Sequence, residues 1–327
     1  MDYTEEKNSA ITAVLAAATL CTRVQAALAH DDTIQKVDKS PVTIADFGSQ
    51  ALVNMVLMEQ CPGDSVVAEE DAGYLRDPGN TGITSRVLAR VNECRPGTDT
   101  ERLLTAIDHG NGACMPDGRF WTLDPIDGTK GFLRGDQYAI ALALIDRGRV
   151  VLGVLGCPNL PLNSADPDGE HGCLFIAVRG QGAFMRSLSD PTETPVRVND
   201  ISDPTRAIFC ESVESAHTSH GRSARVAELL GVTAEPFRID SQCKYAAVAR
   251  GDASIYMRLP STKGYQEKIW DHAAGSIVVE EAGGNVTDTH GTALDFTLGK
   301  TLARNTGILA SNGILHHQLL PALNTIE

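Results

Sequence analysis

The sequence predicts an α+β half followed by an α/β half, and three observations support this fold class. With 327 residues the chain is too long for one ordinary core and suits two packed domains. Strand-like runs dominate residues 120–185, whereas strands and helices alternate beyond the proline-containing stretch 190–204. Hydrophobic residues make up 42% of the chain, enough to build large cores. We therefore expect an N-terminal domain over residues 1–199 and a C-terminal domain over residues 200–327.

Two amphipathic helices are predicted at the start of the chain. Apolar residues recur at helical spacing over residues 4–29, and a second run with this spacing covers residues 43–59. Pro62 and Gly63 end the second helix. Residues 65–68 then form a short predicted strand that leads into a cluster of acids.

A loop-rich elaboration and one mainly antiparallel sheet are predicted next. Residues 76–119 contain several Pro and Gly breakers with two helical patches between them. Five strand-like runs follow, at residues 120–124, 139–145, 150–155, 174–178 and 182–185. Turn sequences such as Asp146-Arg147-Gly148 join these runs. Residues 180–183 suggest a nucleotide loop, but they lack a third glycine and open no helix, so we interpret them as a hairpin turn.

The second half of the chain alternates between strands and helices. Strands are predicted at residues 207–210, 237–239 and 253–259, and near Val286 and Ile308. Helices are predicted over residues 222–230, 243–250 and 270–282. The sequence contains no internal repeat and no low-complexity segment.

Composition limits the partners of this protein. The 42 acids outnumber the 28 basic residues, and the resulting net charge of −14 would repel a polyanion. We therefore expect no nucleic-acid polymer as a partner. A small phosphorylated substrate is compatible with this charge where a metal ion or a local basic patch offsets it.

Location and redox state follow from three simple features. Mean hydropathy is near zero, and no apolar run approaches the roughly 20 residues of a bilayer span. The N-terminus opens with acids, so no secretory or organelle-targeting leader is visible. The eight cysteines form no C-x-x-C motif, which favours reduced, mostly buried thiols. We expect a cytoplasmic or nuclear monomer without a membrane partner.

Three acidic clusters stand next to apolar residues at element boundaries, where a merely solvating charge is unexpected. They are residues 69–71 after a strand, residues 124–129 (Asp-Pro-Ile-Asp-Gly-Thr), and Asp271 at a helix start. Carboxylate oxygens are hard ligands that suit Mg²⁺. The proline between Asp124 and Asp127 fixes the backbone so that both carboxylates can face one site.

Each cluster also has a simpler structural interpretation. Residues 69–71 alone would be a solvated turn, Asp271 alone a helix N-cap, and Asp46 alone a polar helix residue. The string at residues 124–129 is hard to explain by turn chemistry. Together, and in this order, the clusters favour a metal site.

Four motifs resemble one family of enzymes. Residues 67–71, 121–129 and 269–275 resemble the three defining motifs of the lithium-sensitive, metal-dependent phosphatases related to inositol monophosphatase, and residues 40–47 match the N-terminal motif. Within that superfamily, Lys130-Gly131-Phe132-Leu133-Arg134 and Asp240-Ser241-Gln242-Cys243-Lys244-Tyr245 are most similar to the 3′(2′),5′-bisphosphate nucleotidases. The resemblance implies a two-domain sugar-phosphatase-like fold of stacked αβαβα layers, with a mainly antiparallel N-terminal sheet and a mixed C-terminal sheet.

The resemblance also implies two or three Mg²⁺ ions and a base. The implied metal ligands are Glu69, Asp124, the carbonyl of Ile126, Asp127 and Asp271. Asp124 would bridge two ions, which together stabilise an in-line displacement and activate a bound water. Thr129 would contact that water, and Asp46 would accept from the Thr129 hydroxyl, because a hydroxyl alone is a poor base.

The implied reaction is removal of the 3′-phosphate of adenosine 3′,5′-bisphosphate (PAP) to give AMP, with possible action on the sulfate-bearing analogue PAPS. The implied substrate contacts are Gly128, Thr129, His217, Ser241, Lys244, Arg258 and Asp271. His220 is an alternative to His217. Residues 238–268 hold six basic residues and three acids, a local charge of +3 that fits a pocket for a second phosphate.

Two alternative functions remain. An inositol polyphosphate 1-phosphatase of the same superfamily would share the metal ligands and differ over residues 217–258; assays on both substrates would separate the two. A non-catalytic nucleotide sensor on the same fold would lack part of the metal or base set, and this chain keeps all of it.

Overall fold

The computed structural model describes residues 2–27, 33–35, 41–213, 220–260, 262 and 264–326. The helices of the first half are α1 (Thr4–Ala26), α2 (Ile44–Gln60), α3 (Gly73–Arg76), α4 (Thr81–Cys94), α5 (Thr100–Asp108) and α6 (Thr129–Arg134). Its strands are β1 (Thr33–Gln35), β2 (Pro41–Thr43), β3 (Ser65–Ala68), β4 (Arg119–Asp127), β5 (Ala139–Asp146), β6 (Arg149–Pro161), β7 (His171–Val178), β8 (Gly182–Ser187) and β9 (Thr194–Pro195).

The second half supplies a smaller sheet and the remaining helices. Its strands are β10 (Phe209–Glu211), β11 (Phe237–Arg238), β12 (Ile255–Arg258), β13 (Asn285–Thr287) and β14 (Ile308–Ser311). Its helices are α7 (His220–Leu229), α8 (Cys243–Ala249), α9 (Ala273–Glu281) and α10 (His316–Ile326).

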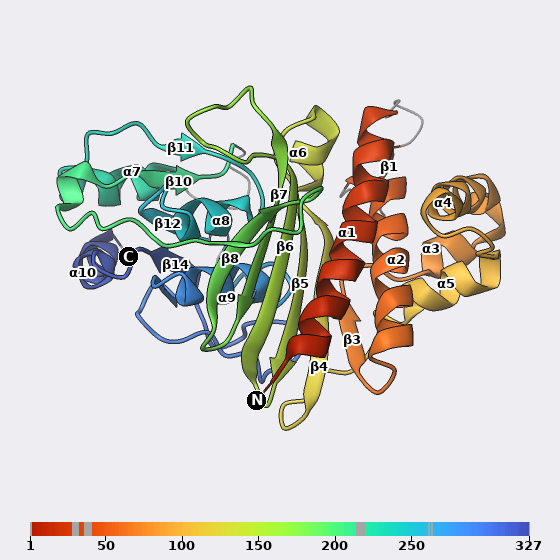
Figure 1. The fold of residues 1–327 in the computed structure, drawn as a ribbon. Helices are drawn as coiled ribbons and strands as arrows, with labels where there is room; N and C mark the ends of the chain where they lie inside the picture. The colour runs from red at the N-terminus through yellow and green to blue at the C-terminus, as the bar shows by residue number, and fades with distance from the viewer. Residues whose placement is uncertain are drawn as a thin grey trace.

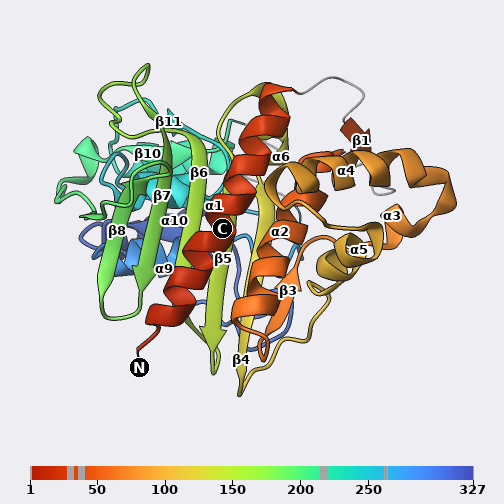
Figure 2. The same cartoon turned by 45° about the vertical axis from the view of Figure 1, so that its right-hand side comes forward.

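Helices and sheets alternate in five layers, which confirms the expected αβαβα arrangement (Figure 1). Helices α1 and α2 cover one face of the larger sheet, and α8 and α9 lie between the two sheets. Helices α7 and α10 pack on the outer face of the smaller sheet through a separate apolar cluster. Helices α4 and α5 are the two helical patches of the predicted elaboration and lie beside α2, and α3 precedes them (Figure 2).

Both sheets have the predicted character. The larger sheet has the order β3-β4-β5-β6-β7-β8-β9, and each neighbouring pair is antiparallel except β3 with β4. The smaller sheet has the order β11-β10-β12-β14-β13 and is mixed, because β10 runs parallel to β11 and β12 while β14 runs antiparallel to its neighbours. Each sheet therefore lies within one of the two predicted domains, whose boundary at residue 199 stays a prediction.

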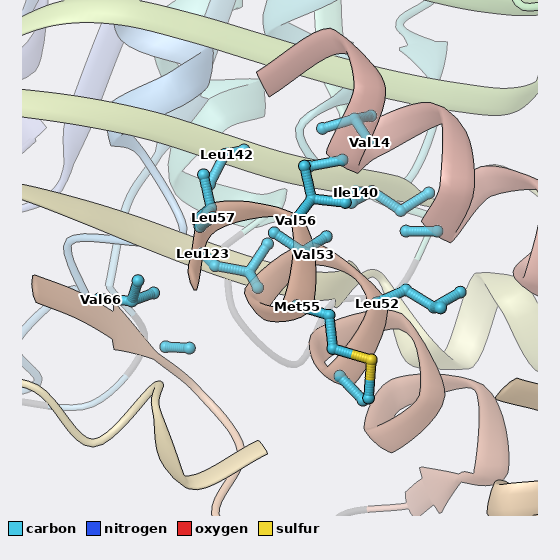
Figure 3. Packing of buried hydrophobic residues seen from close by; sticks show 14 of the residues in the cluster. Val14, Leu52, Val53, Met55, Val56, Leu57, Val66, Leu123, Ile140 and Leu142 are labelled. Atoms are coloured by element: carbon cyan, nitrogen blue, oxygen red, sulfur yellow. The ribbon is translucent and has the colours of Figure 1, made fainter. Parts of the chain in front are cut away.

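The first two helices bury an apolar face on the larger sheet. Val14 of α1, with Leu52, Val53 and Val56 of α2, packs towards Ile140 of β5 (Figure 3). Several buried positions of α1 are alanines, and these small side chains bring α1 close to its neighbours.

Helix α1 corrects one expectation from the sequence. Among the described residues it is the one helix long and apolar enough to cross a membrane by length and composition, whereas we expected no such run. Half of its apolar window is buried inside the protein, where it packs on α2 and the larger sheet. A core helix meets the same length and composition test, so this feature is weak evidence for a membrane span.

Other predictions are confirmed with small shifts at element ends. Arg147 and Gly148 have φ of 48° and 72° and form the predicted tight turn, and Gly180 and Gly182 lie in the predicted hairpin turn. All eight cysteines are free, and six of them are buried. Local sequence patterns did not predict α3, α6, α10, β9 and the β1–β2 pair, which are short elements or lack clear periodicity.

A close approach of α8 to α9 generates a stability prediction. A Cβ atom built on Gly275 of α9 would lie 2.2 Å from a ring carbon of Tyr245 on α8, so Gly275→Ala must displace a buried ring. We expect a loss of about 1–3 kcal/mol in the free energy of unfolding, measured by urea denaturation. Gly82→Ala in α4 is the matched control, because no atom lies within 4 Å of its Cβ position. The control should gain about 0.5–1 kcal/mol from helix propensity, and equal effects at both sites would contradict the prediction.

Candidate active site

A cavity of about 440 Å³ lies where the two sheets and the intervening helices converge. Ten of the predicted site residues line it, namely Glu69, Asp124, Ile126, Asp127, Gly128, Thr129, Ser241, Lys244, Arg258 and Asp271. They come from both halves of the chain, from residues 69 to 271. Tertiary packing therefore gathers almost the whole predicted set into one place.

The end of β4 carries two of the carboxylates. The register between β4 and β5 shifts between Asp124 and Asp127, so the strand is irregular where the proline falls. The amide of Ile126 donates to Asp124 Oδ1 at 3.1 Å, and the Ser49 hydroxyl of α2 donates to the Pro125 carbonyl at 2.8 Å. These bonds fix the irregular segment so that Asp124 and Asp127 both face the cavity.

Two unusual backbone conformations meet at the cavity wall. Gly128 has φ of 88° and precedes α6, while Ser241 has φ of 65°, which is uncommon for a residue with a side chain. A Cβ atom on Gly128 would lie 2.9 Å from Ser241 Cβ, so only glycine fits here. The two halves of the chain therefore touch directly beside the carboxylates.

The cluster at residues 69–71 divides into three different environments. Glu69 is exposed and lines the cavity, while Glu70 is buried. The Gln50 side chain of α2 holds the Glu70 backbone, accepting from its amide at 3.0 Å and donating to its carbonyl at 2.6 Å. Asp71 instead accepts from the Gly73 amide at 2.8 Å. The interpretation of this cluster as only a solvated turn is therefore wrong for Glu70.

Asp271 lies in a turn before α9, so its interpretation as a helix N-cap is wrong. The N-cap of α9 is His272, and its side chain makes no capping hydrogen bond. Predicted as helix from residue 270, this segment becomes helical only at Ala273. The turn frees the Asp271 carboxylate to face the cavity.

Gln242 connects this turn to Asp127, a role that was not predicted from the sequence. Its backbone amide donates to Asp127 Oδ2 at 2.6 Å. Its buried side chain donates to the Trp270 carbonyl at 2.9 Å and accepts from the Gly275 amide at 3.0 Å. Gln242 lies within the family-like run at residues 240–245, which was the one available signal for this residue.

Burial and mutual repulsion dominate the electrostatics of the carboxylates. Burial raises the pKa of Asp124 well above its usual value, and the charges of Glu69, Asp127, Asp271 and Asp46 raise it further. Burial also raises the pKa of Asp127 and of Asp271, although nearby cations oppose both shifts. Carboxylate oxygens that repel one another in this way form a donor set that fits a divalent cation.

Two cations, Lys244 and Arg258, line the same cavity, and we call them its cationic wall. Lys244 is 5% exposed, and its ammonium makes no ion pair or hydrogen bond with any described residue; it lies 5.3 Å from the centre of the Tyr256 ring. Burial lowers its pKa, while the charge of Asp127 opposes that shift. Arg258 pairs with Glu267 at 2.8 Å and contacts Asp271 at 3.4 Å.

The structure gives fewer contacts for the remaining predicted residues. Asp46 is buried in the first turn of α2. The Thr129 hydroxyl donates to the Ile126 carbonyl at 3.3 Å, and the pairing of Asp46 with Thr129 stays a prediction. His217 lies outside the described residues, and so does the side chain of His220, its predicted alternative.

Comparison with known proteins points to one family of relatives. A family model described as the inositol monophosphatase family matches residues 2–327. A 3′(2′),5′-bisphosphate nucleotidase from Oryza sativa is 50% identical over 98% of this chain and 93% of its own length. A protein of the same name from Emericella nidulans is 42% identical over 100% of this chain and 99% of its own length.

Solved structures share the fold at lower sequence identity. The extragenic suppressor protein suhB from Bartonella henselae aligns with a TM-score of 0.65 at 22% identity and covers 97% of both chains. An inositol monophosphatase from Thermotoga maritima aligns with a TM-score of 0.65 at 21% identity over 97% of this chain and 95% of its own. These similarities confirm the predicted fold class.

The buried charge of Asp124 generates a prediction about stability without added metal. Its pKa in the folded chain lies above the usual value of 3.8, so its ionised form destabilises the folded state increasingly as pH rises from 3.8 through the raised pKa. In EDTA at pH 8, the free energy of unfolding of Asp124→Asn should therefore exceed that of the parent protein by about 1.4 kcal/mol for each unit by which the pKa of Asp124 is raised. The variant should accordingly melt at a higher temperature than the parent protein.

Added Mg²⁺ should then raise the melting temperature of the parent protein and leave that of Asp124→Asn nearly unchanged. The matched control is Asp71→Asn, which removes an exposed aspartate that does not line the cavity. An Asp124→Asn protein that melts below the parent in EDTA would show that this carboxylate stabilises the metal-free fold.

Proposed function

The chain belongs to the inositol monophosphatase family, and on this premise we propose that it is a 3′(2′),5′-bisphosphate nucleotidase that converts adenosine 3′,5′-bisphosphate to AMP and phosphate. The observation that carries the choice of substrate is the pair Lys244 and Arg258 in the same cavity as the carboxylates. A substrate with two phosphates can place one at the acidic end and the other against these cations.

The acidic end would hold Mg²⁺, in two or three ions. Glu69, Asp124, the Ile126 carbonyl, Asp127 and Asp271 are the residues that would bind it, and all of them line the cavity. Their fit to a cation follows from the raised pKa of Asp124, where burial and neighbouring negative charges act in the same direction. Bound Mg²⁺ would supply charge stabilisation for the phosphoryl group and a water of lowered pKa.

The cationic wall would bind the phosphate that does not react. Lys244 is a buried ammonium without an acidic partner among the described residues, and a phosphate would compensate its burial. Arg258 can offer further N–H donors towards the same phosphate. Binding of the remote phosphate would align the reacting phosphate, so part of this binding energy would appear as rate.

The base would be Thr129 with Asp46 behind it. Thr129 lines the cavity beside Gly128, and Asp46 is close enough for its charge to raise the pKa of Asp124. A threonine hydroxyl can orient a water, and a carboxylate that accepts the hydroxyl proton strengthens that role. Asp46 would then act on proton movement without binding the cation.

Substrate selection can be tested by removing one charge from the cationic wall. Lys244→Met keeps the bulk of the side chain over Tyr256 and removes the ammonium. We expect kcat/KM for adenosine 3′,5′-bisphosphate to fall about 10- to 100-fold, the scale of a lost charge-assisted contact. Hydrolysis of adenosine 3′-monophosphate should change little, because that substrate lacks the remote phosphate.

The control is Lys7→Met, which removes an ammonium paired with Glu193 and absent from the cavity wall. It should leave both substrates unaffected. Equal losses of kcat/KM on both substrates in Lys244→Met would show that Lys244 does not bind the remote phosphate. Faster release of phosphate from inositol 1,4-bisphosphate than from the nucleotide would favour the inositol-phosphate alternative.

If Thr129 and Asp46 form the base, their substitution should lower kcat much more than it lowers Mg²⁺ affinity. Asp46→Asn and Thr129→Ala should each lower kcat by about 10²-fold or more, the usual contribution of a positioned base. Mg²⁺ affinity, measured calorimetrically without substrate, should change much less. Thr129→Ser keeps the hydroxyl and should keep most of the activity. An Asp46→Asn protein with unchanged kcat would show that Asp46 is only structural.

A further inference from the structure

A buried ionic network lies directly behind the cavity and contains a residue that the mechanism above does not use. Glu267 is 1% exposed, and its Oε2 lies 2.8 Å from Arg258 Nε and 3.1 Å from His272 Nε2. His272 Nδ1 in turn contacts the Tyr245 hydroxyl at 2.8 Å. The network is therefore anchored on β12, on the turn before α9, and on α8.

Arg258 is shared between two carboxylates in this arrangement. Its Nε side faces Glu267 at 2.8 Å, while Nη2 reaches Asp271 Oδ2 at 3.4 Å. Burial alone would raise the pKa of Glu267, but the hydrogen bond from His272 and the charge of Arg258 hold it below its usual value. An ionised Glu267 thus supplies the nearer counter-charge, and Asp271 keeps only a long contact.

A metal site is the competing interpretation of this cluster. Ligand atoms of Glu267, Asp271 and His272 all lie within 4.8 Å of one another, a spacing that could hold an ion. Both nitrogens of His272 already have partners, and the guanidinium of Arg258 is in direct contact with the Glu267 carboxylate. A second cation at this point would be repelled by Arg258, so the geometry disfavours a metal here.

We propose that Glu267 is a positioning residue that keeps the Arg258 guanidinium from pairing fully with Asp271. Arginine stays charged in proteins, so a guanidinium that loses Glu267 must find another anion. Asp271 is the nearest described carboxylate left to it and can accept a two-pronged pair. Such a pair would occupy a predicted Mg²⁺ ligand and would draw Arg258 away from the substrate phosphate.

This inference rests on the proposed function for the role of Asp271, so its test uses cation binding without nucleotide. The variants are Glu267→Gln, which keeps the shape of the side chain, and Glu267→Leu, which removes its polar atoms. Each is combined with Arg258→Met. Calorimetric titration with Mg²⁺, together with the thermal shift that Mg²⁺ produces, gives the apparent affinity of each folded variant.

We expect Mg²⁺ affinity to fall about tenfold in Glu267→Leu and less in Glu267→Gln, the scale seen when partners of metal ligands are removed. Adding Arg258→Met should restore the affinity of both, because the competing guanidinium is gone. Unchanged affinity in the folded Glu267 variants would overturn the proposal. Affinity that stays low in the double variants would also overturn it and would make Glu267 a metal ligand.

The matched control is Asp64→Asn. Asp64 is a buried carboxylate outside the cavity that accepts from Arg119 Nε and from the Trp121 ring N–H, each at 2.9 Å, so its surroundings resemble those of Glu267. This control should lose stability and keep its Mg²⁺ affinity. Hydrolysis of adenosine 3′,5′-bisphosphate by the parent protein tests the proposed function separately, so the failure of either idea can be recognised.

Discussion

Repulsion among carboxylates gathered at one cavity is the constraint on which the rest of this structure depends. Glu69, Asp124, Asp127 and Asp271 come from three segments of the chain and line the same cavity, and burial together with their mutual repulsion raises the pKa of Asp124. Like charges separate unless rigid elements hold them. The protein therefore places each carboxylate at the end of a well-packed strand or in a turn fixed by buried hydrogen bonds.

Neutral polar side chains provide much of this restraint. Gln50 holds the backbone beside Glu69, and Gln242 links Asp127 to the turn that carries Asp271. Neither glutamine adds charge to an already crowded site. Because each also satisfies buried backbone groups, its loss would leave those groups without partners. The carboxylates are thus held in place by uncharged side chains that take no part in the reaction.

Charge alternates across the cavity and the layer behind it. The carboxylates face Lys244 and Arg258, and Glu267 lies behind Arg258 with His272 at its other side. Arg258 therefore has Glu267 as its nearer anionic neighbour, whereas the Lys244 ammonium has no ion-pair partner among the described residues. A bisphosphate suits this pattern. One phosphate can bind to the carboxylates through Mg²⁺, and the other can bind directly to Lys244 and Arg258.

The sequence by itself determined most strands of the two larger sheets, the turn at Arg147 and Gly148, the short string carrying Asp124 and Asp127, and the family to which these motifs point. Those features depend on local periodicity, turn chemistry and residues close in sequence. Only the tertiary structure decided that Asp271 lies in a turn, that Gln242 links Asp127 to that turn, and that Arg258 contacts both Glu267 and Asp271. These contacts join layers far apart along the chain, and their geometry is set by how the sheets and helices pack, which no local pattern encodes.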